Sequence, residues 1–168
     1  MPPFMHAFGA KGIIVQTLEL RIPPVVLVLV MAGLMWALKV VTAPSLGFAF
    51  PLSLFVALVV GTAGFAFALL GVREFRSAGT TVDPRVPDQS ASLVVRGVYR
   101  ISRNPMYVGF LLVLIAWGIF LSNLASLALL PAFVVYMNRF QIIPEERRMK
   151  AKFGEAYHQY EAKVRRWV

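Results

Sequence analysis

Four long apolar runs alternate with short polar or charged segments along the chain. Because about 20 apolar residues at a rise of 1.5 Å cross roughly 30 Å of hydrocarbon, each run predicts a membrane-spanning helix. Charged residues within the runs are confined to Lys39 and Arg139, each near an end. Only Ser122 and Asn123 separate the last two runs, which predicts a tight helical hairpin over 105–143. The pattern predicts an all-α integral membrane protein, with its spans at residues 23–41, 48–71, 105–121 and 124–143.

An amphipathic segment follows the fourth run. From Met149 onward, apolar and aromatic residues recur at helical spacing with basic residues on the other faces. This predicts one C-terminal helix of about six turns that lies in the headgroup plane of the membrane. Tyr157 and Tyr160 are then expected to be interface anchors, with catalytic phenols as the alternative. Gly154 predicts a packing contact or a bend, and Pro144 predicts that the fourth run ends or bends.

The basic residues fall almost entirely on one side of the expected spans. Sixteen of the 17 Lys and Arg residues lie in the N-terminal segment, in the 72–104 loop or after residue 138, which leaves Lys39 alone on the other side. Since an excess of Lys and Arg marks the cytoplasmic side, we expect both termini in the cytoplasm, at the plasma membrane if the cell is prokaryotic. No small-residue cleavage site follows the first run, so we expect it to be retained as a helix.

Composition excludes several other classes of protein. The 168 residues are 58% apolar and only 15% charged, against about 25% charged in soluble domains. Nucleic-acid binding needs a soluble domain with a basic face, and this composition provides no such domain for the net charge of +9. We therefore expect no nucleic-acid partner. The absence of cysteine and the two distant histidines leave no expected metal site. We expect one structural domain, in which residues 1–71 carry the first two spans and residues 72–168 carry the chemistry.

The second run carries a stripe of small residues spaced four, three, four and three apart. Such a stripe allows the backbone of a neighbouring helix to approach closely. It predicts packing against another helix of the same chain, and the alternative is a homodimer seam. The protein is therefore expected to be a monomer or a homodimer joined through this span. The stripe consists of Ala57, Gly61, Gly64, Ala68 and Gly71.

Groups capable of chemistry collect where the third span begins and the fourth ends. Asn104 is a favourable N-cap and Pro105 suits the first helical position, so free backbone N–H groups and the helix dipole favour an anion there. Glu145 and Glu146 fall in the first turn after Pro144, where the dipole stabilises carboxylates. Taken singly, each feature also has an ordinary structural explanation as a helix cap or a first-turn acid.

Five short motifs follow one another in the second half of the chain. They are Gly97-Val-Tyr-Arg, Arg103-Asn-Pro-Met-Tyr-Val-Gly109, Pro144-Glu-Glu, Lys152-Phe-Gly-Glu-Ala-Tyr-His-Gln-Tyr160 and Val164-Arg-Arg-Trp167. In this order the motifs resemble those of the integral membrane methyltransferases typified by isoprenylcysteine carboxyl methyltransferase and the phospholipid N-methyltransferases. The similarity covers about residues 79–168. One position departs from the pattern, because Asn104 stands where the family usually has a histidine, and asparagine cannot become an imidazolium.

The resemblance implies S-adenosylmethionine as methyl donor, S-adenosylhomocysteine as product and an enzyme of class EC 2.1.1. Arg103 and the start of the third span suit the cofactor carboxylate, and Glu145 or Glu146 suits its ammonium group or ribose diol. The ring of Tyr107 would lie near the cation, and Gly109 would allow close approach to the backbone. The positions carried over as cofactor-binding are Arg103, Asn104, Pro105, Tyr107, Gly109, Glu145 and Glu146.

Residues after the fourth span are also expected to act on the acceptor. Lys152 and either Arg147 or Arg148 would hold an anionic acceptor, and Glu146 would in addition orient a basic group or remove a proton from an amine. Membrane lipids and lipophilic or small molecules are the expected partners: an isoprenylcysteine-like carboxylate, a phospholipid amine or a thiol. Two alternatives stay open, a sterol-reductase-like enzyme with a nicotinamide cofactor and a non-catalytic membrane scaffold or lipid-binding protein.

Overall fold

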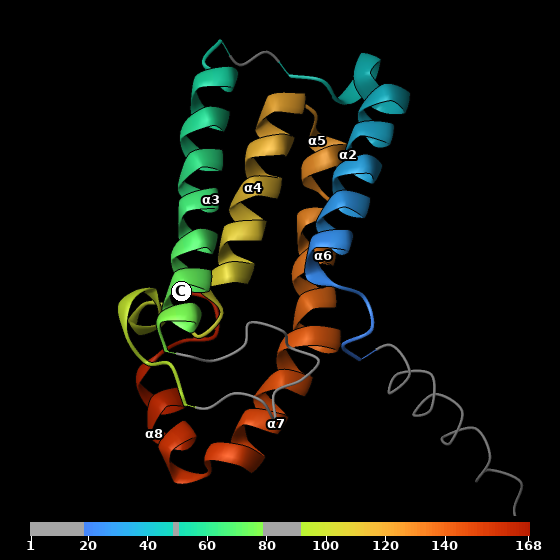
Figure 1. The fold of residues 1–168 in the computed structure, drawn as a ribbon. Helices are drawn as coiled ribbons and strands as arrows, with labels where there is room; N and C mark the ends of the chain where they lie inside the picture. Colours follow the sequence, from blue (N-terminus) through green and yellow to red (C-terminus); the bar gives the residue numbers. More distant parts are fainter. Residues whose placement is uncertain (1–18, 49–50, 79–91) are drawn as a thin grey trace, which may run out of the picture.

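A computed structural model describes residues 19–48, 51–78 and 92–168, and within these ranges the long elements are all helices (Figure 1). Three helical stretches are long and apolar enough to cross a membrane, and a shorter apolar helix accompanies them. The protein is an all-α integral membrane protein, as the apolar runs predict. The three long stretches are α2 (Pro24–Leu46), α3 (Ser53–Ser77) and the continuous helix Leu124–Phe153, and the shorter one is α4 (Pro105–Leu121).

Helices α3 and α4 pack against each other along the small-residue stripe. A Cβ atom added to Gly64 would lie 2.7 Å from Leu112 Cβ and 2.8 Å from the Gly109 carbonyl oxygen. Only glycine permits that approach between two backbones. The prediction of packing within the chain is confirmed at Gly64 and Gly71, where α4 lies against the stripe.

The turn between the third and fourth spans is a tight hairpin, as predicted. Ser122 adopts a left-handed conformation (φ 49°) at the end of α4, and the Asn123 side chain then caps the next helix by accepting the Ser126 N–H at 3.0 Å. The same residues bind α2, because Ser126 Oγ donates to the Met35 carbonyl at 2.6 Å and Asn123 Nδ2 donates to Thr42 Oγ1 at 3.1 Å. Hydrogen bonds between spans thus fix the hairpin to α2.

The fourth span continues through Pro144 without a break. Pro144 has no N–H to offer the Phe140 carbonyl, and the Leu20 N–H donates to that carbonyl at 3.0 Å. Gln141 Nε2 also donates to the Ile22 carbonyl at 2.6 Å. The segment ahead of α2 therefore binds the part of the helix that the proline perturbs. This stretch comprises α5 (Leu124–Leu127), α6 (Leu130–Met137), the π-helical turn η4 (Asn138–Ile142) and α7 (Ile143–Phe153).

The prediction of one six-turn C-terminal helix is wrong, because the chain leaves the helix at Gly154. This glycine has φ +50° and ψ −124°, and a Cβ atom added to it would meet nothing within 4 Å. Its function is therefore the bend and not a packing contact. After the bend, α8 (Glu155–Lys163) turns back from α7 toward the ends of α3 and α4 (Figure 1).

The reversal of α8 also corrects the expectation for its tyrosines. Tyr157 and Tyr160 are 4% and 8% exposed, so they are not anchors at a membrane surface. The Tyr160 hydroxyl donates to the Tyr99 carbonyl at 2.7 Å, which binds α8 to the short 3-10 helix η3 (Gly97–Arg100). A single helix in the headgroup plane would have left both rings at the lipid surface.

An apolar groove of about 510 Å³ lies between α2, α3 and α4. Small residues such as Ala57 and Gly61 form part of it, together with larger side chains such as Leu58, Trp117 and Phe120. Trp117 is held in place because its Nε1 donates to the Ala32 carbonyl at 3.0 Å. The groove contains no ionisable residue and is distinct from the polar cluster described below.

Candidate active site

The cluster begins at the loop that leads into α4. Pro105 is the first residue of this helix, and the Asn104 carbonyl accepts the N–H groups of Tyr107 and Val108, each at 3.0 Å. Asn104 thus occupies the predicted N-cap position, but its side chain does not cap the helix. Its amide nitrogen instead donates to the Arg166 carbonyl at 2.9 Å.

Tyr107 and Glu145 join the two predicted motifs. Tyr107 lies in the first turn of α4 and is only 4% exposed, and its hydroxyl donates to Glu145 Oε1 at 2.5 Å. Glu145 lies in the first turn of α7 and is partly exposed. Residues that are 38 positions apart in the chain therefore meet at one end of the bundle.

Arg103 lies at the centre of the cluster, with its side chain only 8% exposed. Its Nη2 lies 2.9 Å from Glu146 Oε1, and its Nη1 lies 2.9 Å from Glu161 Oε1. Both Nε and Nη1 are buried and make no hydrogen bond of good geometry in the part of the chain that the structure describes, although Nη1 has the ion pair with Glu161. A buried guanidinium needs such anionic partners to offset the loss of water, and the Nε–H of Arg103 has neither kind of contact there.

Glu146 is held by a second arginine. Its side chain is 8% exposed, and Arg166 binds it in a bidentate manner, with Nε 3.0 Å from Oε1 and Nη2 2.7 Å from Oε2. Glu161 in turn lies 2.7 Å from Lys150 Nζ. Positive and negative groups therefore alternate through the cluster, in the order Arg166, Glu146, Arg103, Glu161 and Lys150.

The pKa directions follow from these contacts. Hydrogen bonds from Lys150 and then from Arg103 lower the pKa of Glu161. The hydrogen bonds to Glu146 raise the pKa of Arg166 above its already high usual value. Burial raises the pKa values of Tyr157 and Tyr160, so both phenols keep their protons at neutral pH.

The structure brings together five of the predicted site residues and leaves others apart from them. Gly109 faces α3, where an added Cβ atom would lie 2.5 Å from the Gly64 carbonyl oxygen, so its small size serves helix packing. Arg147 and Lys152 lie at the exposed surface of α7, and Arg147 is 3.6 Å from the Glu19 carboxylate. The five residues that share the cluster are Arg103, Asn104, Tyr107, Glu145 and Glu146.

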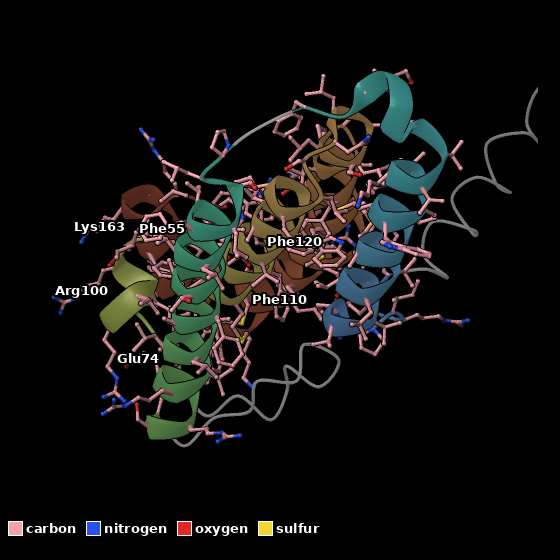
Figure 2. All side chains as sticks on the ribbon, turned by 90° about the horizontal axis from the view of Figure 1, so that it is seen from above. Phe55, Glu74, Arg100, Phe110, Phe120 and Lys163 are labelled. Atoms are coloured by element: carbon pink, nitrogen blue, oxygen red, sulfur yellow. The ribbon has the colours of Figure 1, made fainter. Side chains whose placement is uncertain are left out.

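Three residues of the cluster, Arg166, Glu161 and Lys150, were not among the predicted site residues. Arg166 belongs to the last quoted motif, but a basic residue near a membrane reads first as a surface anchor. Glu161 lies two residues before the end of α8 and belongs to none of the motifs. Other basic side chains, such as Arg100 and Lys163, point outward on one side of the molecule (Figure 2).

No group of three or more His, Cys, Asp or Glu side chains with metal-binding geometry occurs among the described residues.

Comparison with known proteins places the chain in a family. The phospholipid methyltransferase family model matches residues 52–156, which include α3, α4 and α7. An uncharacterised protein of Haemophilus influenzae is 41% identical over 63 residues, which are 38% of this chain and the whole of that protein. No solved structure matches the chain. Since the family match spans more than half of the residues, the protein is a membrane methyltransferase of the phospholipid methyltransferase family.

Proposed function

We propose that the protein transfers a methyl group from S-adenosylmethionine to a lipophilic or small acceptor that reaches it from the membrane, at a site on the cytoplasmic face. The observation that carries the proposal is the meeting of Arg103, Tyr107 and Glu145 at one end of the bundle. Two segments separated by a membrane hairpin supply these residues, and both lie within the family match.

The chemistry of these side chains fits the cofactor. Arg103 has a buried Nε–H without a partner, and a charge-assisted hydrogen bond to a carboxylate would satisfy it. Glu145 supplies a carboxylate for the ammonium group or the ribose diol. Tyr107 places an aromatic ring beside Glu145, where it favours a nearby cation.

When bound, S-adenosylmethionine supplies an activated methyl group on a sulfonium. The protein residues have to orient the acceptor and exclude water, because charge is neutralised when an anionic nucleophile attacks a sulfonium. Glu146 orients Arg103, since it binds that guanidinium at 2.9 Å. Arg147 and Lys152, at the exposed surface, suit an anionic acceptor or its headgroup.

The first test is a titration of the purified, nanodisc-embedded protein with S-adenosylhomocysteine by calorimetry. We expect saturable binding by the wild type and at least tenfold weaker binding by Glu145→Gln and by Tyr107→Leu. Glu155→Gln is the matched control, because Glu155 is an exposed carboxylate on α8. This variant should bind S-adenosylhomocysteine as tightly as the wild type does.

A second measurement addresses the acceptor. Incorporation of labelled methyl groups into extracted lipids and into small thiols would distinguish the acceptor classes. A folded wild type that shows no saturable binding of S-adenosylhomocysteine would overturn the proposal and favour the non-catalytic scaffold. Equal binding by wild type and Glu145→Gln would remove Glu145 from the site.

A further inference from the structure

The last residues of the chain return to the start of α4. After α8 the backbone becomes extended at Val164 (φ −125°, ψ 131°). The Arg165 carbonyl accepts the Arg103 N–H at 3.0 Å, and the Arg166 carbonyl accepts Asn104 Nδ2 at 2.9 Å and Ser102 Oγ at 3.2 Å. We call residues 164–167 the clasp, because their backbone is bound to the loop that carries Arg103.

Side chains of the clasp bind two further elements. Arg166 reaches α7, where it makes both hydrogen bonds to the Glu146 carboxylate. Trp167 Nε1 donates to Asn138 Oδ1 at 3.1 Å in the π-helical turn, and its ring packs against the apolar core. The clasp therefore joins the loop before α4 to η4 and α7, which the chain connects to that loop only through the membrane hairpin.

Arg166 links these segments through a single residue. Its carbonyl is bound by the α4 loop and its guanidinium by α7, so a shift of Arg166 would separate Glu146 from Arg103. Glu145 adjoins Glu146 in the first turn of α7, so the same shift would draw Glu145 away from Tyr107. The bidentate geometry is specific to a guanidinium, because lysine offers a point charge without the planar fork.

We propose that Asn104 and Arg166 are positioning residues, which hold the α7 carboxylates in register with Arg103 and Tyr107 through the clasp. The inference rests on the proposed function, in which those groups bind the cofactor. It assigns Asn104 the task of donating one hydrogen bond to the Arg166 carbonyl. An imidazole is not needed for that task, so the replacement of the family histidine by asparagine is compatible with activity.

Variants at Arg166 test the first half of the proposal in the full-length, nanodisc-embedded protein. We expect Arg166→Gln to weaken S-adenosylhomocysteine binding at least tenfold and Arg166→Lys to restore part of the loss. Arg165→Gln is the matched control, because it removes the same charge from an exposed neighbour while its backbone contact remains. Its affinity should equal that of the wild type.

A double-mutant cycle separates positioning from general destabilisation. If Arg166 acts through Glu146, the variant with both Arg166→Gln and Glu146→Gln should bind S-adenosylhomocysteine no more weakly than the weaker single variant. Additive losses would overturn the proposed route through Glu146. Emission of Trp167, read in a Trp36→Phe and Trp117→Phe background, should shift to the red when Arg166→Gln releases the clasp; an unshifted spectrum would also contradict the proposal.

Variants at Asn104 test the second half. Asn104→His keeps a donor and should retain binding within about threefold of the wild type, whereas Asn104→Asp cannot donate and should lose at least tenfold. The rate profile of Asn104→His should show no new step near pH 6.5, the usual pKa of histidine. A new step there would mean that the position takes part in proton transfer and would overturn the positioning role.

The two proposals fail in different ways. A folded wild type that binds no S-adenosylhomocysteine would overturn the proposed function and the positioning role together. A wild type that binds, with Arg166→Gln binding equally well, would overturn only the inference about the clasp.

Discussion

Two adjacent glutamates in one helical turn have different surroundings. Consecutive residues of an α-helix point about 100° apart, so Glu145 faces Tyr107 while Glu146 faces Arg103 and Arg166. The sequence presents both as acids after a proline and does not distinguish them. The difference between their partners depends on the rotation of α7 relative to α4 and on the return of the clasp to the loop before α4. Both are features of the tertiary structure.

The ion pairs of Glu161 predict a dependence of stability on pH. The pKa of this carboxyl is lowered, so its contribution is present above the usual value of about 4.3 and is lost as the pH falls through the lower, folded value. We expect Glu161→Gln to loosen the docking of α8 at pH 7 by about 1 kcal/mol, the upper end for partly exposed pairs. Hydrogen exchange of the α8 amides measures this difference.

The wild type at low pH is the internal control for that measurement. The carboxyl gains a proton only when the pH falls below its lowered, folded pKa, so the exchange rates of wild type and Glu161→Gln should converge as the pH is lowered through that value. A difference that does not change with pH would show that Glu161 acts through packing and not through its charge.

At the scale of whole elements, α4 has two tasks on different parts of its surface. Its first turn carries Tyr107 into the site, and its next turn presents Gly109 to α3. The close approach of α3 therefore sets where the first turn of α4 lies. A substitution that changes how α3 packs against α4 should therefore displace Tyr107 without replacing any residue of the cluster.

Substitution of Gly64 tests this arrangement. In Gly64→Leu the new side chain would collide with Leu112 and the Gly109 carbonyl, and we expect a loss of at least about 2 kcal/mol of stability. Gly33→Leu is the matched control, because a Cβ atom there meets nothing within 4 Å. Thermal unfolding in detergent should show a lower midpoint for Gly64→Leu alone. Equal midpoints would contradict the close packing of α3 and α4.

The elements that sequence patterns predict well are those fixed by local chemistry. Apolar runs predict the spans, because hydrocarbon admits few other structures, and Ser122 with Asn123 predicts the hairpin. Gly154 signals a bend, but its direction depends on the Tyr160 bond to the Tyr99 carbonyl, which joins residues 61 positions apart. The motifs contain the five predicted residues that meet in the cluster but also Gly109 and Lys152, which lie apart from it, and the pairing of Arg166 with Glu146 requires the folded chain.

At the scale of the whole molecule, the ion pairs between described residues lie at one end of an apolar bundle. The loop before α4, α7, α8 and the clasp all lie at the end where α3 finishes (Figure 1). The opposite end holds the hairpin and the end of α2, and within residues 19–48, 51–78 and 92–168 Lys39 is the one Lys or Arg on that side. The excess of basic residues at the site end predicts that it faces the cytoplasm.

Single cysteines test that orientation directly, because the chain has none of its own. Ser45→Cys lies at the exposed end of α2, and Arg165→Cys lies at the exposed clasp. In intact cells a membrane-impermeant maleimide should label Ser45→Cys, whereas Arg165→Cys should react only after the membrane is opened. Neither side chain supports the site, so both variants should fold and bind S-adenosylhomocysteine as the wild type does. The reverse labelling pattern would place the clasp and the site outside the cytoplasm, where the cell supplies no S-adenosylmethionine, and would contradict the proposed reaction as well as the orientation.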